Sequence, residues 1–575
     1  MNSSLIFPPF VFMIAGALIL PFLPVRIRSS AFLLWPALTL LMIFITPEGE
    51  IINYSLAGYT LILSSFDPLS RVFGAIFALI AFIGGVYSLN LKDTGQQIAA
   101  LLYAGGAIGV TFAGDFFTLF IFWELMAVSS AWLIWAGGTE ESGKAGMRYI
   151  LVHLFGGGLL LAGILIHISA AGDTSLLPFT QGSSTASWLI LAGVAINAAI
   201  PPLHAWLADA YPRGSVTGSV FLSAFTTKCA VYVLVRLYPG WDILIYAGVI
   251  MTFYGLIYAI IANDIREILS YHIISQVGYM VTGVGIGTAL ALNGAVALAF
   301  SNIIYKTLLF MGAGVVLYTT GKSRMAELGG FYRHQKVAAL LYLVGAFAIS
   351  GFPLLNGFIS KSMIVSAAGY AQYNLIMLLL ILASVGTFLS IALKLPYFTW
   401  FGEERGIKPE AAPKVMLAAM TMLAFLCALF GVMPDLLYRY LPYDSSYDPF
   451  TMAHVIESLY VTIFTFTAFW VVRGKMIPGL NISIDTDWFY RKPAGFMRLI
   501  FVDYVNAFFD RMEELSISAV SALYEMSRNP LRYFVNDGSD SKEYSLGRYR
   551  LQMQSIISLI LITFIIIAAV GIASM

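Results

Sequence analysis

The stretch Ala192-Gly-Val-Ala-Ile-Asn-Ala-Ala-Ile-Pro-Pro-Leu-His-Ala-Trp-Leu-Ala-Asp-Ala-Tyr-Pro212 starts as an apolar helix and meets two prolines halfway along. Because proline lacks a backbone donor and frees carbonyls upstream, Pro201 and Pro202 predict a broken helix. The stretch Ile349-Ser-Gly-Phe-Pro-Leu-Leu-Asn-Gly-Phe-Ile-Ser-Lys361 repeats this pattern, with a break at Pro353. Backbone freed at membrane depth is tolerated only where it is buried in protein or lines a wet cavity. Two such helices in corresponding halves of a chain are typical of ion-handling transporters.

The composition requires a lipid environment. The chain has 575 residues, of which 59% are hydrophobic and 11% charged, and its mean hydropathy is +0.83. A soluble protein carries roughly a quarter charged residues, so the sequence predicts an all-α polytopic membrane protein. The net charge of +1 argues against a nucleic-acid partner. Cys229 and Cys427 lie in apolar runs without metal or disulfide spacing, and we expect no cofactor, no metal and no cleavable signal peptide.

Apolar runs of about 20 residues, the length that crosses a bilayer, predict about 16 transmembrane helices. A hairpin outside the bilayer is expected at 51–65. With the N-terminus outside, 25 of the 32 Lys and Arg lie in or beside the cytoplasmic loops, as the positive-inside rule requires. Both termini are then outside. The predicted spans are 5–24, 30–46, 68–90, 97–113, 115–137, 147–171, 187–209, 215–238, 241–262, 268–286, 292–319, 337–369, 374–400, 413–432, 454–473 and 552–574.

Glu124 and four lysines lie inside these spans, away from their outer ends. A charge at the bilayer centre costs about 2.5–3.5 kcal/mol, so each of them needs a reason. Glu124 lies roughly 14 Å into its span at the helical rise per residue. The other four are Lys228, Lys306, Lys361 and Lys394, and Lys394 is near the cytoplasmic end of its helix.

Two interpretations account for these charges. In one, Glu124 and a lysine form a buried ion pair that only holds helices together. In the other, burial lets the lysines gain and lose protons, and together with polar side chains and water they form a proton relay. Four lysines cannot all be neutralised by one carboxylate, which favours the relay. The linking groups would be Asn197, His204, Thr226, His272, Ser275, Gln276 and Asn302, whereas His153 and His167 are interpreted as packing residues.

The segment 474–551 differs in kind from the rest of the chain. It contains an expected helix over 494–528 with one polar stripe and one wide apolar face. One interpretation is a membrane-surface helix that closes a loop. The other is a helix that lies along the membrane and braces this subunit or a neighbour.

Several motifs in fixed order over roughly residues 68–400 resemble the antiporter-like subunits shared by respiratory complex I, membrane-bound hydrogenases and Mrp-type cation/proton antiporters. The stretch 210–228 resembles the D-type branch of the Mrp subunits. Asp487-Trp-Phe-Tyr490 and the helix after it resemble the distal complex I subunit, whose lateral helix clamps its neighbours. The motifs are Phe122-Trp-Glu124, Pro202-Leu-His-Ala-Trp-Leu-Ala-Asp209, Asp264-Ile-Arg-Glu-Ile-Leu-Ser-Tyr-His272, Ser275-Gln276-Val-Gly278, Tyr305-Lys-Thr-Leu-Leu-Phe310, Ala326-Glu-Leu-Gly-Gly330 and Gly351-Phe-Pro with Phe358-Ile-Ser-Lys361.

The resemblance implies two inverted five-helix repeats. It assigns Glu124 to the fifth-helix glutamate of the family, Lys228 to the eighth-helix lysine and Lys361 to the twelfth-helix residue that opens to one side. The family usually has a lysine where this chain has Asn197, so Glu124 would pair with Lys228 instead. The expected proton pathway is Glu124, Lys228, His272, Lys306, Lys361 and Lys394, with polar relay groups and helix breaks at Asn197, Pro201, Pro202, His204, Gln276, Asn302 and Pro353.

The predicted function is that of a proton-translocating subunit of an Mrp-type Na+/proton antiporter in the cell inner membrane, with other membrane subunits as partners and no catalytic site of its own. The alternatives are a proton-pumping subunit of a complex I or hydrogenase-type complex, and the membrane partner of an inorganic-carbon uptake system. The expected parts are N-terminal helices (1–96), a first repeat (97–238), a second repeat (239–400), additional helices (401–473), a cytoplasmic loop with the amphipathic helix (474–551) and a final span (552–575).

Overall fold

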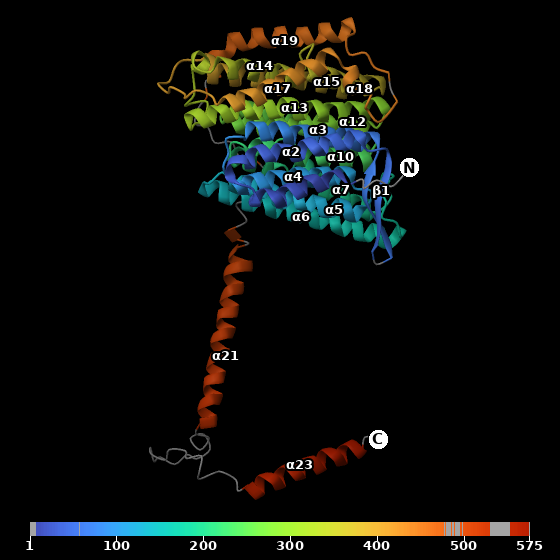
Figure 1. Cartoon of the computed structure of the whole chain (residues 1–575), viewed down its shortest axis with the longest axis vertical. Helices are drawn as coiled ribbons and strands as arrows, with labels where there is room; N and C mark the ends of the chain where they lie inside the picture. Colours follow the sequence, from blue (N-terminus) through green and yellow to red (C-terminus); the bar gives the residue numbers. More distant parts are fainter. Residues whose placement is uncertain are drawn as a thin grey trace. The chain divides into compact units, whose positions relative to one another are not determined.

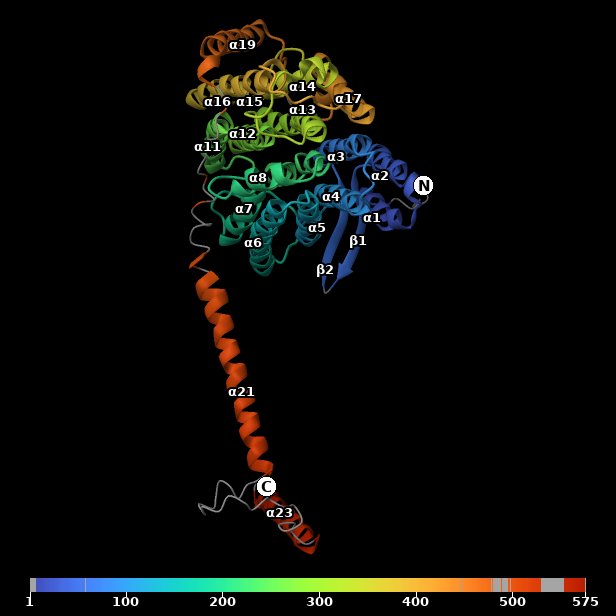
Figure 2. The same ribbon diagram turned by 90° about the vertical axis from the view of Figure 1, so that its left-hand side faces the viewer.

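The computed structural model describes residues 7–56, 58–444, 446–476, 478, 485, 488, 495–496, 498–528 and 553–573. The chain divides into two compact units, Met1–Asp487 and Trp488–Met575. In the first unit, long helices lie side by side, with α6 along one margin, α19 along the other and α12 and α13 between them (Figures 1 and 2).

The N-terminal elements pack on one side of the first unit. A strand pair follows the second helix, and its antiparallel register runs from Gly49 opposite Phe66 to Leu56 opposite Tyr59. The expected hairpin is therefore confirmed. The elements are α1 (Pro9–Ile19), η1 (Leu20–Phe22), α2 (Val25–Ile45), β1 (Gly49–Leu56), β2 (Tyr59–Phe66) and α3 (Pro68–Tyr87).

The next elements contain the first broken helix and, in addition, a break that the sequence did not predict. The expected helix over 215–238 is interrupted at 223–225, between α9 and α10. The elements are α4 (Thr94–Phe112), α5 (Phe116–Trp135), α6 (Glu140–Ala171), α7 (Thr185–Ala198), α8 (Ala205–Ala210), η2 (Tyr211–Arg213), α9 (Gly218–Leu222) and α10 (Thr226–Leu237).

The following elements contain the second broken helix. The expected helix over 374–400 starts as an α-helix but continues in two wider π-helical segments, η4 and η5. The elements are α11 (Asp242–Ile261), α12 (Ile265–Ile286), α13 (Ala289–Thr320), η3 (Phe331–Arg333), α14 (Lys336–Ser350), α15 (Asn356–Tyr370), α16 (Asn374–Thr387), η4 (Phe388–Lys394) and η5 (Tyr397–Phe401).

The two halves share local details. Asp115 and Asp264 each cap the helix that follows, accepting hydrogen bonds from two backbone amides. Each also forms a bridge to the chain beyond the two helices that follow it, Asp115 with Ser175 and Asp264 with Arg324. The helices between, α6 and α13, both have 32 residues and both end at a glycine in the left-handed conformation, which glycine adopts without steric cost. Each half then has its broken helix.

The remaining elements complete both units. In the first unit they are α17 (Lys414–Val432), α18 (Asp435–Tyr438), α19 (Met452–Val472) and η6 (Arg473–Lys475). In the second unit they are η7 (Leu499–Asp503), α21 (Tyr504–Arg528) and α23 (Met553–Ala573). The predicted helix over 494–528 is thus helical through its described part from residue 498.

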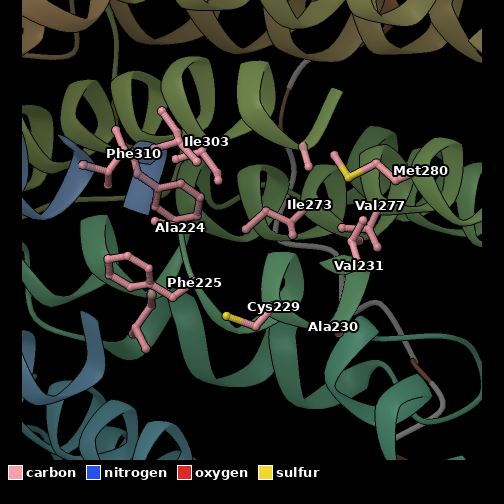
Figure 3. Packing of buried hydrophobic residues seen from close by; sticks show 14 of the residues in the cluster. Ala224, Phe225, Cys229, Ala230, Val231, Ile273, Val277, Met280, Ile303 and Phe310 are labelled. Atoms are coloured by element: carbon pink, nitrogen blue, oxygen red, sulfur yellow. The ribbon is translucent and has the colours of Figure 1, made fainter. Parts of the chain in front are cut away.

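The interior of the first unit is apolar. Figure 3 shows side chains of α10, α12 and α13, among them Val231, Val277 and Ile303, filling the space between these helices. Among the described residues, ten helices are long and apolar enough to cross a membrane. A helix lies in every one of the sixteen predicted stretches, while the number of crossings stays a prediction. Large apolar side chains such as Ile250, Leu378 and Phe464 are exposed, as expected for surfaces that face lipid.

Candidate functional site

Lys228 lies at the unpredicted helix break. Its side chain is fully buried, and its amine donates a 2.8 Å hydrogen bond to the Ser223 carbonyl oxygen. The break between α9 and α10 frees this carbonyl, because no helical amide follows in register. The Lys228 amine therefore takes the place of the missing backbone amide at the Ser223 carbonyl oxygen. In turn, this oxygen gives the buried amine a hydrogen-bond acceptor.

Lys306 lies on α13 and is also fully buried. Its amine donates to the Leu269 carbonyl oxygen of α12 at 2.9 Å. Lys306 is close enough to Lys228 and to Lys361 for their positive charges to repel its own. The lysines of α10, α13 and α15 therefore form one series across the first unit, with Lys306 in the middle.

His272 of α12 lies beside this series and interacts electrostatically with Lys306 and Lys361. Its Nε2 shares a 2.5 Å hydrogen bond with the Ser390 hydroxyl of η4. Lys394, one helical turn further along η4, donates to the Ile260 and Ala262 carbonyl oxygens at 2.6 and 3.0 Å. These carbonyls belong to the end of α11, so Lys394 caps that helix.

Gln276 and Asn302 are joined through a tyrosine. The Asn302 amide donates to the Tyr305 hydroxyl at 3.1 Å, and that hydroxyl donates to Gln276 Oε1 at 3.3 Å. All three side chains are fully buried. The link connects α13 to α12 at the level of the lysine series, one residue before Lys306.

Lys361 differs from the other three lysines. It is only 4% exposed, and its amine has no hydrogen-bond partner in the described part of the chain. The amine lies 4.8 Å from the centre of the Tyr279 ring, a cation–π contact. It also lines a cavity of about 270 Å³ whose other polar walls include His454, Glu457 and Ser458 of α19.

Helix α19 also contacts the backbone at the break in the second broken helix. Residues 351–355 separate α14 from α15, and Leu354, which follows Pro353, adopts a left-handed conformation with φ of 69°. The Ser458 hydroxyl donates to the freed Gly351 carbonyl oxygen at 2.7 Å. The break thus has a polar partner from a helix about 100 residues away in the chain.

At the break in the first broken helix, the backbone is hydrogen-bonded by residues of the same stretch of sequence. Ala199, just after α7, is left-handed with φ of 61°, and Pro201 and Pro202 follow in the turn that leads to α8. The Ile196 carbonyl oxygen accepts from the Ala199 amide at 3.0 Å and also from the Trp206 indole at 2.9 Å. Asn197, the last residue but one of α7, is 1% exposed, and its Oδ1 is without a partner among the described residues.

His204 meets a carboxylate that sequence reasoning missed. Asp485 lies in the segment after α19 and is 8% exposed. It accepts hydrogen bonds from the Tyr254 and Tyr271 hydroxyls at 2.5 and 2.6 Å, and its Oδ1 lies 3.3 Å from His204 Nε2. Burial by itself raises the pKa of Asp485, but the nearby His204 ring and the hydrogen bonds from Tyr254 and Tyr271 outweigh it and hold the pKa below its usual range.

The position of Glu124 contradicts the expectation that it pairs with Lys228. It packs against α6, where a methyl group on Gly157 would lie 1.9 Å from its Oε1. The predicted Glu124–Lys228 pair is absent: no ion pair of either residue occurs in the described residues, and Lys228 is engaged by Ser223. The reason is geometric, because the unpredicted break supplies Lys228 with a carbonyl oxygen five residues earlier in the chain.

The structure brings together Lys228, His272, Lys306 and Lys361, while Lys394 lies one helical turn beyond Ser390, the partner of His272. It places Glu124 against α6, and it adds Ser390, His454, Glu457 and Asp485 to the polar groups of interest. Two of these had a signal in the sequence, because His454 and Glu457 are ionisable residues inside a predicted span. Across the described residues, no group of three or more His, Cys, Asp and Glu is arranged to hold a metal ion.

Buried amines beside two broken helices in a helical membrane protein are typical of ion transporters. Comparisons with known proteins agree with this class. Residues 113–390 match the family described as NADH:quinone oxidoreductase/Mrp antiporter, TM. The D-type subunit of the Na(+)/H(+) antiporter of Alkalihalophilus pseudofirmus is 30% identical over 356 residues, which cover 58% of this chain and 72% of that protein.

Two further comparisons widen the range of relatives. The N-type subunit of the NADH-quinone oxidoreductase of Desulforudis audaxviator is 31% identical over 326 residues, covering 51% of this chain and 64% of that protein. A chain of the Mrp complex from Dietzia sp. has the same fold, with a TM-score of 0.69 at 20% identity over 80% of this chain and 98% of that chain. The protein belongs to the NADH:quinone oxidoreductase/Mrp antiporter family and is a multi-pass membrane subunit of the antiporter-like type.

Proposed function

We propose that this chain is the proton-translocating subunit of a multisubunit Mrp-type antiporter that exchanges a monovalent cation, Na+, for protons. The proposal is carried by the series Lys228, Lys306 and Lys361. Lys306 lies within electrostatic range of both other amines, and among the described residues none of the three has a carboxylate partner. A charge in this environment costs free energy, so the presence of three buried amines indicates a function.

Each amine has the neighbours that a relay needs. Lys228 and Lys306 are hydrogen-bonded to carbonyl oxygens, which accept strongly from an ammonium and more weakly from a neutral amine. Adding a proton at one lysine raises the electrostatic cost of a proton at the next, so protons would advance by mutual repulsion. His272 and the Gln276–Tyr305–Asn302 link lie beside the series, and polar atoms without protein partners at His272, Ser275 and Asn302 are suited to bind water.

In this proposal the chain lies in the cell inner membrane with about sixteen crossings and both termini outside. Residues 97–238 and 239–400 form two inverted five-helix repeats, which is supported by their matching caps, bridges and broken helices. Glu124, His204 and Asn197 serve the first repeat, Lys394 the cytoplasmic end of the second, and Lys361 the opposite side. Residues 1–96, 401–473, 474–551 and 552–575 flank the repeats, and the partners are other membrane subunits.

The test is transport in membrane vesicles that contain the whole complex. Lys361→Ala and Lys228→Ala should each abolish cation-dependent proton movement, measured with a pH-sensitive dye, while the complex assembles normally. Lys408→Ala is the matched control, because Lys408 is exposed on a loop. Exchange at the control rate in either buried variant would refute the proposal.

Relatives among complex I subunits support a second candidate, a proton-pumping subunit of a complex I or hydrogenase-type complex. A third is the membrane partner of an inorganic-carbon uptake system. Purification of the complex from native membranes distinguishes the three, because the co-purifying chains would be other antiporter subunits, iron–sulfur proteins or a zinc protein.

A further inference from the structure

The cavity at Lys361 extends from the buried series to the surface of the protein. Its inner wall includes Lys361, which is 4% exposed, and its wall also includes Tyr370, which is 73% exposed. Both residues lie on α15, nine positions apart, which spans roughly 14 Å at the helical rise. The cavity volume of about 270 Å³ is room for several water molecules, since one needs about 15–30 Å³.

One wall of the cavity belongs to α19, which presents two ionisable side chains to it. His454 and Glu457 are three residues apart, so they share one face of the helix. Both are half-buried. In the described part of the chain, Glu457 has no ion-pair partner and its carboxylate accepts no hydrogen bond from the protein. A carboxylate of α19 and an unpaired lysine amine of α15 therefore line the same cavity.

The position of α19 against the cavity is fixed by polar contacts on both sides of Glu457. Ser458 donates to the Gly351 carbonyl oxygen at 2.7 Å. His454 Nε2 shares a hydrogen bond of 3.1 Å with the Ser366 hydroxyl of α15, and the Tyr447 hydroxyl lies 3.2 Å from the same hydroxyl. Helix α19 is thus hydrogen-bonded both to the break between α14 and α15 and to α15 itself, which carries Lys361.

We propose that Glu457, assisted by His454, is the terminal proton-exchange group of the path, between Lys361 and the aqueous side opposite the lysine-rich loops. When the Lys361 ammonium loses a proton through water in the cavity, it becomes a neutral amine, and the Glu457 carboxylate becomes a carboxyl group. That carboxyl group then releases the proton to bulk water and returns to its charged form. The reverse sequence loads Lys361. This inference rests on the proposed function of Lys361.

Neutral replacement of the carboxylate tests the proposal in the assembled complex. Glu457→Gln keeps the size of the side chain and should lower cation-driven proton exchange by about 10-fold or more, since positioned acid–base groups contribute about 10²–10⁴-fold to proton transfer. Glu457→Asp should retain most of the activity. Glu410→Gln, at an exposed loop position, is the matched control.

The outcomes separate this inference from the proposed function. If Lys361→Ala is inactive while Glu457→Gln and His454→Gln exchange protons at the control rate, the role of α19 is refuted and the proposed function stands. If Lys361→Ala itself is active, the proposed function fails.

Accessibility gives a readout that does not depend on activity. Cys229 and Cys427 are buried, so a new cysteine can be labelled selectively. Val461 lines the cavity, whereas Ile463 on the same helix is 59% exposed on the apolar surface. A charged, membrane-impermeant thiol reagent added outside the cell should label Val461→Cys and not Ile463→Cys. Absence of labelling at Val461→Cys, or labelling only from the cytoplasmic side, would overturn the proposal.

Discussion

A single methyl group at Gly157 tests whether the position of Glu124 matters for transport. An alanine Cβ there would lie 1.9 Å from Glu124 Oε1, whereas a carbon and an oxygen in contact need about 3.3 Å. The carboxylate must therefore move by roughly 1.4 Å, the difference between these two distances. Because it is the far end of a flexible side chain, this movement costs the fold little.

The neighbouring glycine provides the control. Gly158 lies in the same helix, and a methyl group there meets nothing within 4 Å. Glycine-to-alanine replacement stabilises a helix by about 1 kcal/mol, and this effect is common to Gly157→Ala and Gly158→Ala. The comparison of the two variants therefore isolates the displacement of Glu124.

The expected result is a loss of function without a loss of assembly. Misplacement of a reacting group by about 1 Å costs up to about 100-fold in rate, so Gly157→Ala should reduce proton exchange by about 10- to 100-fold. The assay is cation-driven proton movement in vesicles, with complex assembly checked on native gels. Exchange by Gly157→Ala within about twofold of Gly158→Ala would refute the argument that Glu124 acts from its position against α6.

Three further predictions concern individual contacts. Trp206→Phe removes the indole donor at the first helix break and should lower stability by about 1–3 kcal/mol, seen as a lower midpoint in thermal unfolding; an unchanged midpoint would contradict it. Ser390→Ala removes the 2.5 Å partner of His272 and should slow proton exchange, whereas Ser390→Thr should restore it; equal rates in both would exclude a role for this hydroxyl. Burial raises the pKa of Asp67, but Arg236, 2.6 Å away, and Ser70 outweigh it and lower the pKa, so the contribution of Asp67 to stability is present above pH of about 4 and lost at lower pH; the unfolding midpoint of the wild type should fall more between pH 5 and 3 than that of Asp67→Asn, and parallel curves would argue against this contribution.

The sequence was informative where a single residue type sets the local backbone. Pro201, Pro202 and Pro353 predicted both helix breaks because proline cannot continue the hydrogen-bond ladder. The β-hairpin and the apolar stretches followed equally from local patterns. The break before Lys228 was missed, because Ser223-Ala-Phe225 contains neither proline nor glycine. The lysine amine takes the place of the lost amide at the Ser223 carbonyl oxygen, and the Thr226 amide donates to the distant Tyr103 hydroxyl, so the break depends on a contact that local sequence does not predict.

The candidate site was predicted in its residue types but not in its pairing. Intramembrane charge pointed to Glu124 and the four lysines, because each is costly in lipid. The expected Glu124–Lys228 pair depended on the distance between two helices, and the structure places Glu124 against α6 instead. Asp485 could not be assigned from the sequence either, because its three partners lie more than 200 residues away in the chain.

By itself, the sequence determined that this is a helical membrane protein with two broken helices and buried amines, because hydropathy, proline and charge act over a few residues. Only the tertiary structure decided which carbonyl each amine contacts, that Lys361 alone among the four lysines faces a cavity without a partner in the described residues, and that α19 lines the same cavity. These features depend on how distant helices pack. Packing brings together groups such as Lys361 and Glu457, whose separation of 96 positions in the chain leaves no trace in local sequence.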